Sequence, residues 1–240
     1  MAATARPAST DDSIAPEPRL GTAFRKAGQD FYFNSWRLVP ANLVWAVALG
    51  AVVVGAIVWL PAALLISVVA VPLAGIHRMA ALIVREDGAT FGDFIDGMRR
   101  RAGAALVAGV ISIILAIVFW SNVILGLQID NPVGWFLSAT AAYAEVALAM
   151  VLVAFWPLLA DPRREHLSGR RALVLAGLVC LARPGRMFIL TLLIGALLVA
   201  ATAILPAIAL VGVSYVSLVA THYVLPLADN LESAAVTRVR

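Results

Sequence analysis

Long apolar runs, separated by short polar connections, are the dominant pattern along this chain. A helix needs about 20 apolar residues to cross roughly 30 Å of hydrocarbon, and six runs reach about that length. The predicted spans are residues 40–60, 61–84, 104–125, 135–159, 187–205 and 206–227. The pattern therefore predicts an all-α integral membrane protein with six transmembrane helices.

Prolines mark two of the expected turns between these spans. Pro61 and Pro206 each follow a leucine at the start of an apolar run. Proline is favoured in the first turn of a helix, because its missing N–H breaks no helical hydrogen bond there. Both positions predict tight hairpin tips, so the six spans are expected to pair as three hairpins. Within the second span, Pro72 and Gly75 predict a kink.

A short amphipathic segment precedes each predicted hairpin. In the clearest one, Phe91 and Phe94 are three residues apart on one helix face. Thr90 and Asp93 form the sequence pattern of a capping box at its start. Residues 172–182 would reach only about 16 Å as a helix, too short to span. We favour an interfacial helix there over a re-entrant one. The threefold pattern fits either an internal triplication or ordinary interfacial helices.

Charged residues are distributed so unevenly that they predict an orientation. On this assignment all 18 Lys and Arg lie on one side. They are in the N-terminal arm, the connections 85–103 and 161–186, and the C-terminus, and Arg78 joins them from just inside the second span. The positive-inside rule places that side in the cytoplasm. We expect a disordered cytoplasmic tail at 1–20, a transmembrane domain at 21–228 and a cytoplasmic C-terminal tail at 229–240.

Composition agrees with a membrane protein and argues against several other classes. Apolar residues make up 62% of the 240, whereas soluble domains contain roughly 45–50%. The net charge of +4 is therefore expected to reflect topology and not nucleic-acid binding. Cys180 is the sole cysteine, which excludes an internal disulfide and a multi-cysteine metal site. Residues 1–20 lack the apolar core of a signal peptide. An alanine- and arginine-rich composition is typical of a GC-rich bacterium, so the bacterial plasma membrane is the expected location.

Enzyme motifs are absent from the sequence. It contains no phosphate-binding loop, no HExxH zinc pair and no GxSxG nucleophile turn. Its three histidines lack metal-ligand spacing. We expect no catalytic activity, no cofactor and no metal.

Glu145 is the residue that a membrane assignment explains least. It lies about ten residues into the fourth predicted span, where an ionised carboxylate is costly. His77 and Arg78 in the second span and His222 in the sixth are its candidate partners. The four residues are either a site that handles protons or substrate, or a polar contact that locks helices together.

The connection 85–103 is the most partner-like surface. It resembles the loop by which importer permeases dock on their ATPase, although the Glu-Ala-Ala and the closing proline of that loop are missing. The candidate docking residues are Asp87, Phe91, Asp93 and Phe94. The arginines at 99–101 are equally suited to anionic lipid headgroups.

Three features together resemble the YesL-like family of bacterial membrane proteins, a domain of unknown function, over residues 22–228. They are an asparagine early in the first span, a proline-rich second span that leads to two arginines, and an Asp-Phe stretch before a basic cluster. Their residues are Asn42, Pro61, Pro72, Gly75, Arg78, Arg85, Asp93 and Phe94. The sequence departs from the family after Pro61, where two alanines replace the expected Thr-x-Gly.

The resemblance implies no established activity, but it does imply an accessory role beside a carbohydrate importer. We therefore expect a non-catalytic accessory subunit whose partners are the lipid bilayer and ABC transporter subunits. The alternative is a small transporter or channel with Glu145 lining its pathway. A transporter needs a wetted path from both sides, whereas an accessory scaffold should have a dry interior.

Overall fold

The computed structural model describes residues 18–129, 131–204 and 208–239. In chain order the helices are α1 (Leu20–Val58), η1 (Leu60–Val69), α2 (Ala70–Glu86), α3 (Phe91–Gln128), α4 (Pro132–Ala160), η2 (Pro162–Arg164), α5 (Gly169–Ala182), α6 (Pro184–Thr202), η3 (Ile208–Gly212) and α8 (Val213–Val239). All regular elements in the described ranges are helical, and six helices there are long and apolar enough to cross a membrane, counting η1 with α2. This confirms the predicted all-helical class with six span-length helices.

Two predictions fall largely or wholly outside the described residues. The tail predicted at 1–20 is described only from residue 18 onward, and the predicted tip at Pro206 is not described. Residues 229–239, which we expected to form a C-terminal tail, continue α8 as a helix.

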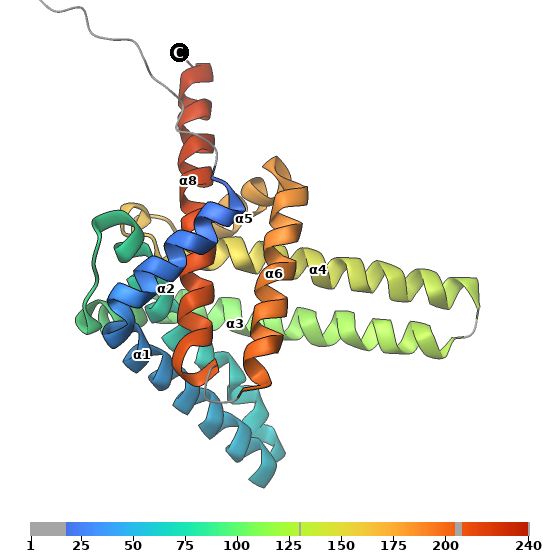
Figure 1. Cartoon of the computed structure of the whole chain (residues 1–240). Helices are drawn as coiled ribbons and strands as arrows, with labels where there is room; N and C mark the ends of the chain where they lie inside the picture. Colours follow the sequence, from blue (N-terminus) through green and yellow to red (C-terminus); the bar gives the residue numbers. More distant parts are fainter. Residues whose placement is uncertain (1–17, 130, 205–207, 240) are drawn as a thin grey trace, which may run out of the picture.

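The first helix, α1, is longer than one membrane crossing requires. Its 39 residues extend about 58 Å, so the amphipathic segment and the span predicted from residue 40 belong to one continuous helix. Pro40 lies inside it, and proline removes one helical hydrogen bond, which is the usual cause of a kink. Figure 1 shows α1 changing direction along its length.

A turn lies directly before Pro61, where the sequence predicts one. Trp59 has an extended backbone conformation and ends α1, and Pro61 lies in the first turn of η1. The second predicted span then has two parts, because η1 is a 3₁₀ helix of ten residues and α2 begins at Ala70. Pro72 therefore falls in the first turn of α2, where it is well tolerated.

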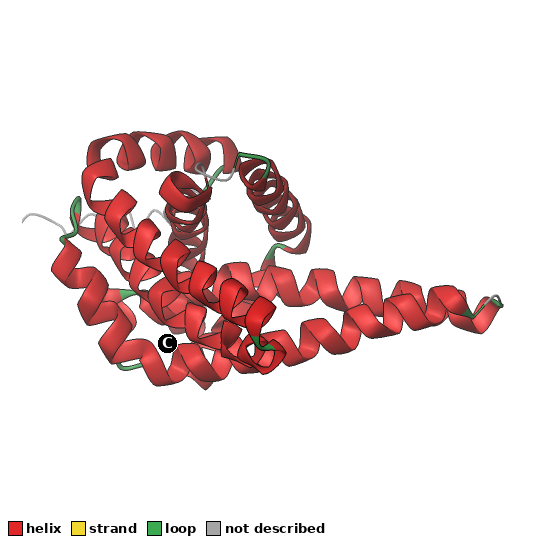
Figure 2. Ribbon diagram, turned by 90° about the horizontal axis from the view of Figure 1, so that it is seen from below, coloured by secondary structure: helices red, strands yellow, loops and turns green. Residues whose placement is uncertain are grey.

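Helices α3 and α4 form a long hairpin that projects from the rest of the protein (Figure 1). The capping box predicted at the start of α3 is present. At the far end Asn131 caps α4 by accepting from the backbone N–H groups of Val133 and Gly134. Ser138 Oγ donates to the carbonyl of Val123 across the hairpin at 2.9 Å. The hairpin runs crosswise to α8 in Figure 1 and projects from the other helices in both views (Figures 1 and 2), so the six helices are not one parallel bundle.

The core lies where α2 and α8 meet the C-terminal part of α4. Tyr223 and Met79 are completely buried there. A close approach of α2 to α3 depends on Gly75, because a Cβ at this position would lie 2.7 Å from the ring of Phe94. By contrast, only 11% of the most apolar windows of α1 and α3 is buried inside the protein. The outer surface of these two helices is consequently apolar and uncovered.

Candidate functional site

The most closely connected polar residues lie where the ends of α2, α4 and α8 meet. Arg85 donates to Asp229 at 2.5 Å and to Asp161 at 2.8 Å. Arg164 of η2 donates to Asp161, to Asp229 at 2.6 Å and to Glu232 at 2.7 Å. We call these five residues the ion cluster. Two guanidinium groups thus bridge three carboxylates, one at the junction of α4 and η2 and two on α8.

The ion cluster is buried at its centre and open at one edge. The side chain of Asp161 is 0% exposed, and those of Arg85 and Arg164 are 8% and 5% exposed. Burying a charge costs several kcal/mol unless it is paired and hydrogen-bonded. Burial opposes the charged form of Arg164, but hydrogen bonds to Glu232 and Asp229 outweigh it and raise the pKa of its guanidinium. The arrangement therefore holds three chain segments together through charge-assisted hydrogen bonds.

A second group of arginines lies beside the ion cluster. Arg78 donates to Glu165 at 2.5 Å, and Arg100 reaches the other oxygen of the same carboxylate at 3.4 Å. Arg101 donates to the backbone carbonyls of Arg164, Glu165 and Leu167. The side chains of Arg78, Arg100, Arg101 and Glu165 line a cleft of about 210 Å³. Arg78 is therefore paired with Glu165 and not with Glu145.

The two histidines proposed as partners of Glu145 are also held elsewhere. His77 Nε2 lies 3.3 Å from Ser217 Oγ, and His222 Nε2 lies 2.6 Å from a carboxylate oxygen of Asp30. The second contact joins the first part of α1 to α8. Neither histidine shares a hydrogen bond with Glu145.

Glu145 itself stands apart from these groups. Its Oε2 atom is buried and has no hydrogen-bond partner among the described residues. Trp156, which stacks on the His77 ring, follows Glu145 by eleven residues, or about 16 Å along α4. The structure therefore does not bring Glu145 together with His77, Arg78 and His222.

The pairing of His77 with Ser217 does not have the form of a nucleophile and its base. The Ser217 hydroxyl has one proton, and it donates to the Val213 carbonyl at 2.8 Å. The hydroxyl oxygen must therefore accept a hydrogen bond from the Nε2–H of His77. This leaves His77 Nδ1 as a buried acceptor without a partner in the described structure. A cavity of about 310 Å³ beside this ring is also lined by Trp45, and its exposed wall is apolar.

The four candidate docking residues have different environments. Asp93 accepts from the backbone N–H and the hydroxyl of Thr90, both at 2.7 Å, and is engaged in the capping box. Phe94 is 0% exposed and belongs to the core. Phe91 is 40% exposed, and Asp87 is an exposed residue that ends α2 in a left-handed conformation with φ 58°. Only Phe91 and Asp87 are therefore free to form the centre of a docking surface.

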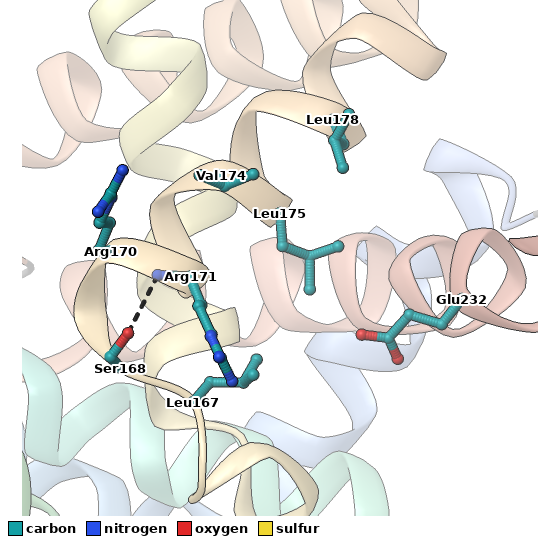
Figure 3. Close-up of a pocket in the computed structure, with 8 residues that line it drawn as sticks. All are labelled: Leu167, Ser168, Arg170, Arg171, Val174, Leu175, Leu178 and Glu232. Atoms are coloured by element: carbon teal, nitrogen blue, oxygen red, sulfur yellow. Dashed lines mark hydrogen bonds between the residues drawn. The ribbon is translucent and has the colours of Figure 1, made fainter.

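A further cleft of about 450 Å³ lies between α5 and α8. Ser168 caps α5 by accepting from the backbone N–H of Arg171 at 3.4 Å (Figure 3). Leu175 of α5 and Glu232 of α8 lie on opposite sides of the cleft in this view. The segment 172–182, which we expected to be a short interfacial helix, is helical within α5 and is not among the span-length helices.

Sequence reasoning missed the acidic members of the ion cluster. Two signals were available: the mixed charges of residues 161–165 directly after a span, and Asp229 with Glu232 three residues apart on one helix face. Neither signal identifies the partner, because Arg85 is 144 residues away from Asp229. The pairing follows only from the packing of α8 against α2.

Within the described residues, no group of three or more His, Cys, Asp or Glu side chains is placed to hold a metal ion. Comparisons with protein families, curated proteins and solved structures find no match to this chain. The resemblance to the YesL-like family therefore stays a prediction, and no residue takes its role from a relative.

Proposed function

We propose that this chain is a multi-pass protein of the bacterial plasma membrane and a non-catalytic accessory subunit of a carbohydrate ABC transporter. Support for the membrane comes from the uncovered apolar surface, on which residues such as Ile57 (80% exposed) and Phe136 (74% exposed) face outward. Because α3 and α4 run crosswise to α8, all six helices cross together only if both sets are strongly tilted. The charged ends of the helices, with the ion cluster, face the cytoplasm in this proposal.

The observation that supports the accessory role is that the interior polar side chains do not form a continuous path. Glu145 shares no hydrogen bond with His77 or His222 in the described structure, and the wall of the cavity beside His77 is apolar. Transport of a polar substrate requires polar groups along a continuous path. The specific link to carbohydrate import rests on the YesL-like resemblance alone.

The proposed docking surface consists of Glu86, Asp87 and Phe91, which are exposed between α2 and α3. Aromatic residues are enriched at protein interfaces, and the two carboxylates beside Phe91 give this surface a negative charge. A basic patch on a transporter subunit is its expected counterpart.

Co-purification tests this proposal. The full chain is extracted from its native host in mild detergent, and the permease and ATPase subunits of ABC importers are quantified by mass spectrometry. We expect them to accompany the wild type and to be lost with Phe91→Ala. Phe33→Ala is the control, because Phe33 is also an exposed phenylalanine but lies on α1, with 73% exposure against 40% for Phe91. A protein that always purifies alone contradicts the proposal.

The unpartnered oxygen of Glu145 supports a second function, that of a small transporter or channel. In that case Glu145→Gln abolishes uptake in cells while expression stays normal. Uptake that is unchanged by Glu145→Gln removes this alternative.

A further inference from the structure

An apolar groove of about 560 Å³ lies at the junction of α3, α4 and α5. Val107, Ile111 and Leu115 of α3 line it at intervals of four residues, so they form one wall. Leu148 and Leu152 of α4 form the opposite wall. Val107 and Ile111 are 61% and 53% exposed, which means that no other part of the described chain covers the groove.

The groove extends along α3. Its α3 side runs from Gly103 to Leu115, which is about 18 Å along the helix. Small side chains, Ala104, Ala108 and Ser112, recur along the same helix and line the groove as well. Apart from Ser112 and Arg170, the residues that line it are apolar, so the space suits a hydrocarbon chain.

One end of the groove carries a free positive charge. Arg170, the second residue of α5, lines that end together with Gly103 and Gly169. Its guanidinium has no hydrogen bond or ion pair with the described residues, in contrast to Arg101, which is held by backbone carbonyls. Figure 3 shows the side chains of Arg170 and Arg171 leaving α5 in different directions.

We propose that the groove binds one acyl chain of an anionic phospholipid and that Arg170 binds its phosphate. An apolar slot that ends at an unpaired guanidinium matches a molecule with a long apolar chain and an anionic head. The proposal rests on the membrane location proposed above and is independent of the accessory role. In the proposed orientation the lipid belongs to the cytoplasmic leaflet, because α5 is close to the ion cluster.

Lipid retention by the full chain tests the proposal. The protein is purified from vesicles that contain equal amounts of phosphatidylglycerol and phosphatidylcholine, and bound lipid is counted by native mass spectrometry. We expect one retained molecule with about a fivefold preference for phosphatidylglycerol, the size of effect that one basic residue gives near a membrane surface. Arg170→Gln should remove the preference, and Arg170→Lys should keep most of it.

A second pair of variants separates the groove from the general lipid surface. Ile111→Trp fills the groove and should abolish retention of both lipids. Ile117→Trp is the matched control on the same helix, because Ile117 is 60% exposed and does not line the groove. Retention that survives Ile111→Trp, or a preference that survives Arg170→Gln, overturns the proposal.

Inorganic phosphate distinguishes the lipid from a soluble ligand. We expect it to leave the thermal unfolding midpoint unchanged at concentrations where phosphatidylglycerol raises it. An equal shift from phosphate alone would contradict a lipid site. These variants leave Phe91 unchanged, so the two proposals can fail separately. Lipid binding can be absent while the protein co-purifies with transporter subunits, and lipid can be bound while the protein purifies alone.

Discussion

Removing Arg164 from the ion cluster should destabilise the protein more than any surface ion pair does. The variant Arg164→Ala breaks a buried hydrogen bond to Asp161 and bonds to the partly exposed carboxylates of Asp229 and Glu232. A hydrogen bond between charged groups in the interior is worth about 1.5–3 kcal/mol. Each partly exposed pair adds about 0.5 kcal/mol after screening by water. Asp161 keeps its hydrogen bond to Arg85, so its charge is not left unpaired. The expected decrease in the free energy of unfolding is therefore about 3 kcal/mol.

Denaturant unfolding of the detergent-solubilised protein, followed by tryptophan fluorescence, measures this loss. The control is Arg100→Ala, since the Arg100 side chain is 59% exposed and its partners are about as accessible. We expect no measurable change of the unfolding midpoint for this control. A double-mutant cycle of Arg164→Ala with Asp161→Ala should give a coupling of at least about 1 kcal/mol. Equal midpoints for both arginine variants, or no coupling, would refute the reasoning.

Three further predictions concern packing, a buried polar contact and the cysteine. Gly75→Ala should lower the free energy of unfolding by about 1–3 kcal/mol, because the new Cβ overlaps an aromatic ring. Its control is Gly195→Ala in α6, where nothing lies within 4 Å. In the same unfolding assay this control should raise the free energy of unfolding by up to about 1 kcal/mol. Asn42→Ala removes the acceptor for the backbone N–H and hydroxyl of Ser214. We expect the free energy of unfolding to fall by about 1–3 kcal/mol. An unchanged unfolding midpoint would argue against the contact. Burial raises the pKa of the Cys180 thiol to about 11, so maleimide at pH 7.5 should label it slowly until the protein unfolds; fast labelling of the folded protein contradicts this. Since the folded pKa is the higher one, the thiol contributes stability below about pH 9 that is lost as the pH rises through about 11.

Local features of the fold could be predicted from the sequence. The turn at Pro61 and the capping box of Thr90 and Asp93 depend on residues close to one another in the chain, and both are present. The six apolar runs likewise reappear as span-length helices. In each case the physical cause acts within one helical turn or one helix, so the sequence contains it completely.

Features that depend on how helices pack could not be predicted. The pattern that places Phe94 on an exposed amphipathic face does not reveal that Gly75 leaves room for its ring in the core. Hydropathy likewise places Glu145 and His77 within spans, but it does not show that His77 contacts Ser217 while Glu145 Oε2 has no partner among the described residues. The mixed charges of residues 161–165 do not reveal that Asp161 is buried, because one of its two arginine partners, Arg85, is 76 residues away in the chain.

Labelling of single cysteines in intact bacterial cells tests the membrane topology, which is the central claim, most directly. On a Cys180→Ala background, Val133→Cys at the exposed tip of the α3–α4 hairpin and Glu86→Cys beside the ion cluster are treated with a membrane-impermeant maleimide. We predict that residue 133 is labelled in intact cells and that residue 86 is labelled only after the membrane is permeabilised. Labelling of residue 86 in intact cells, or protection of residue 133 until permeabilisation, would contradict the account.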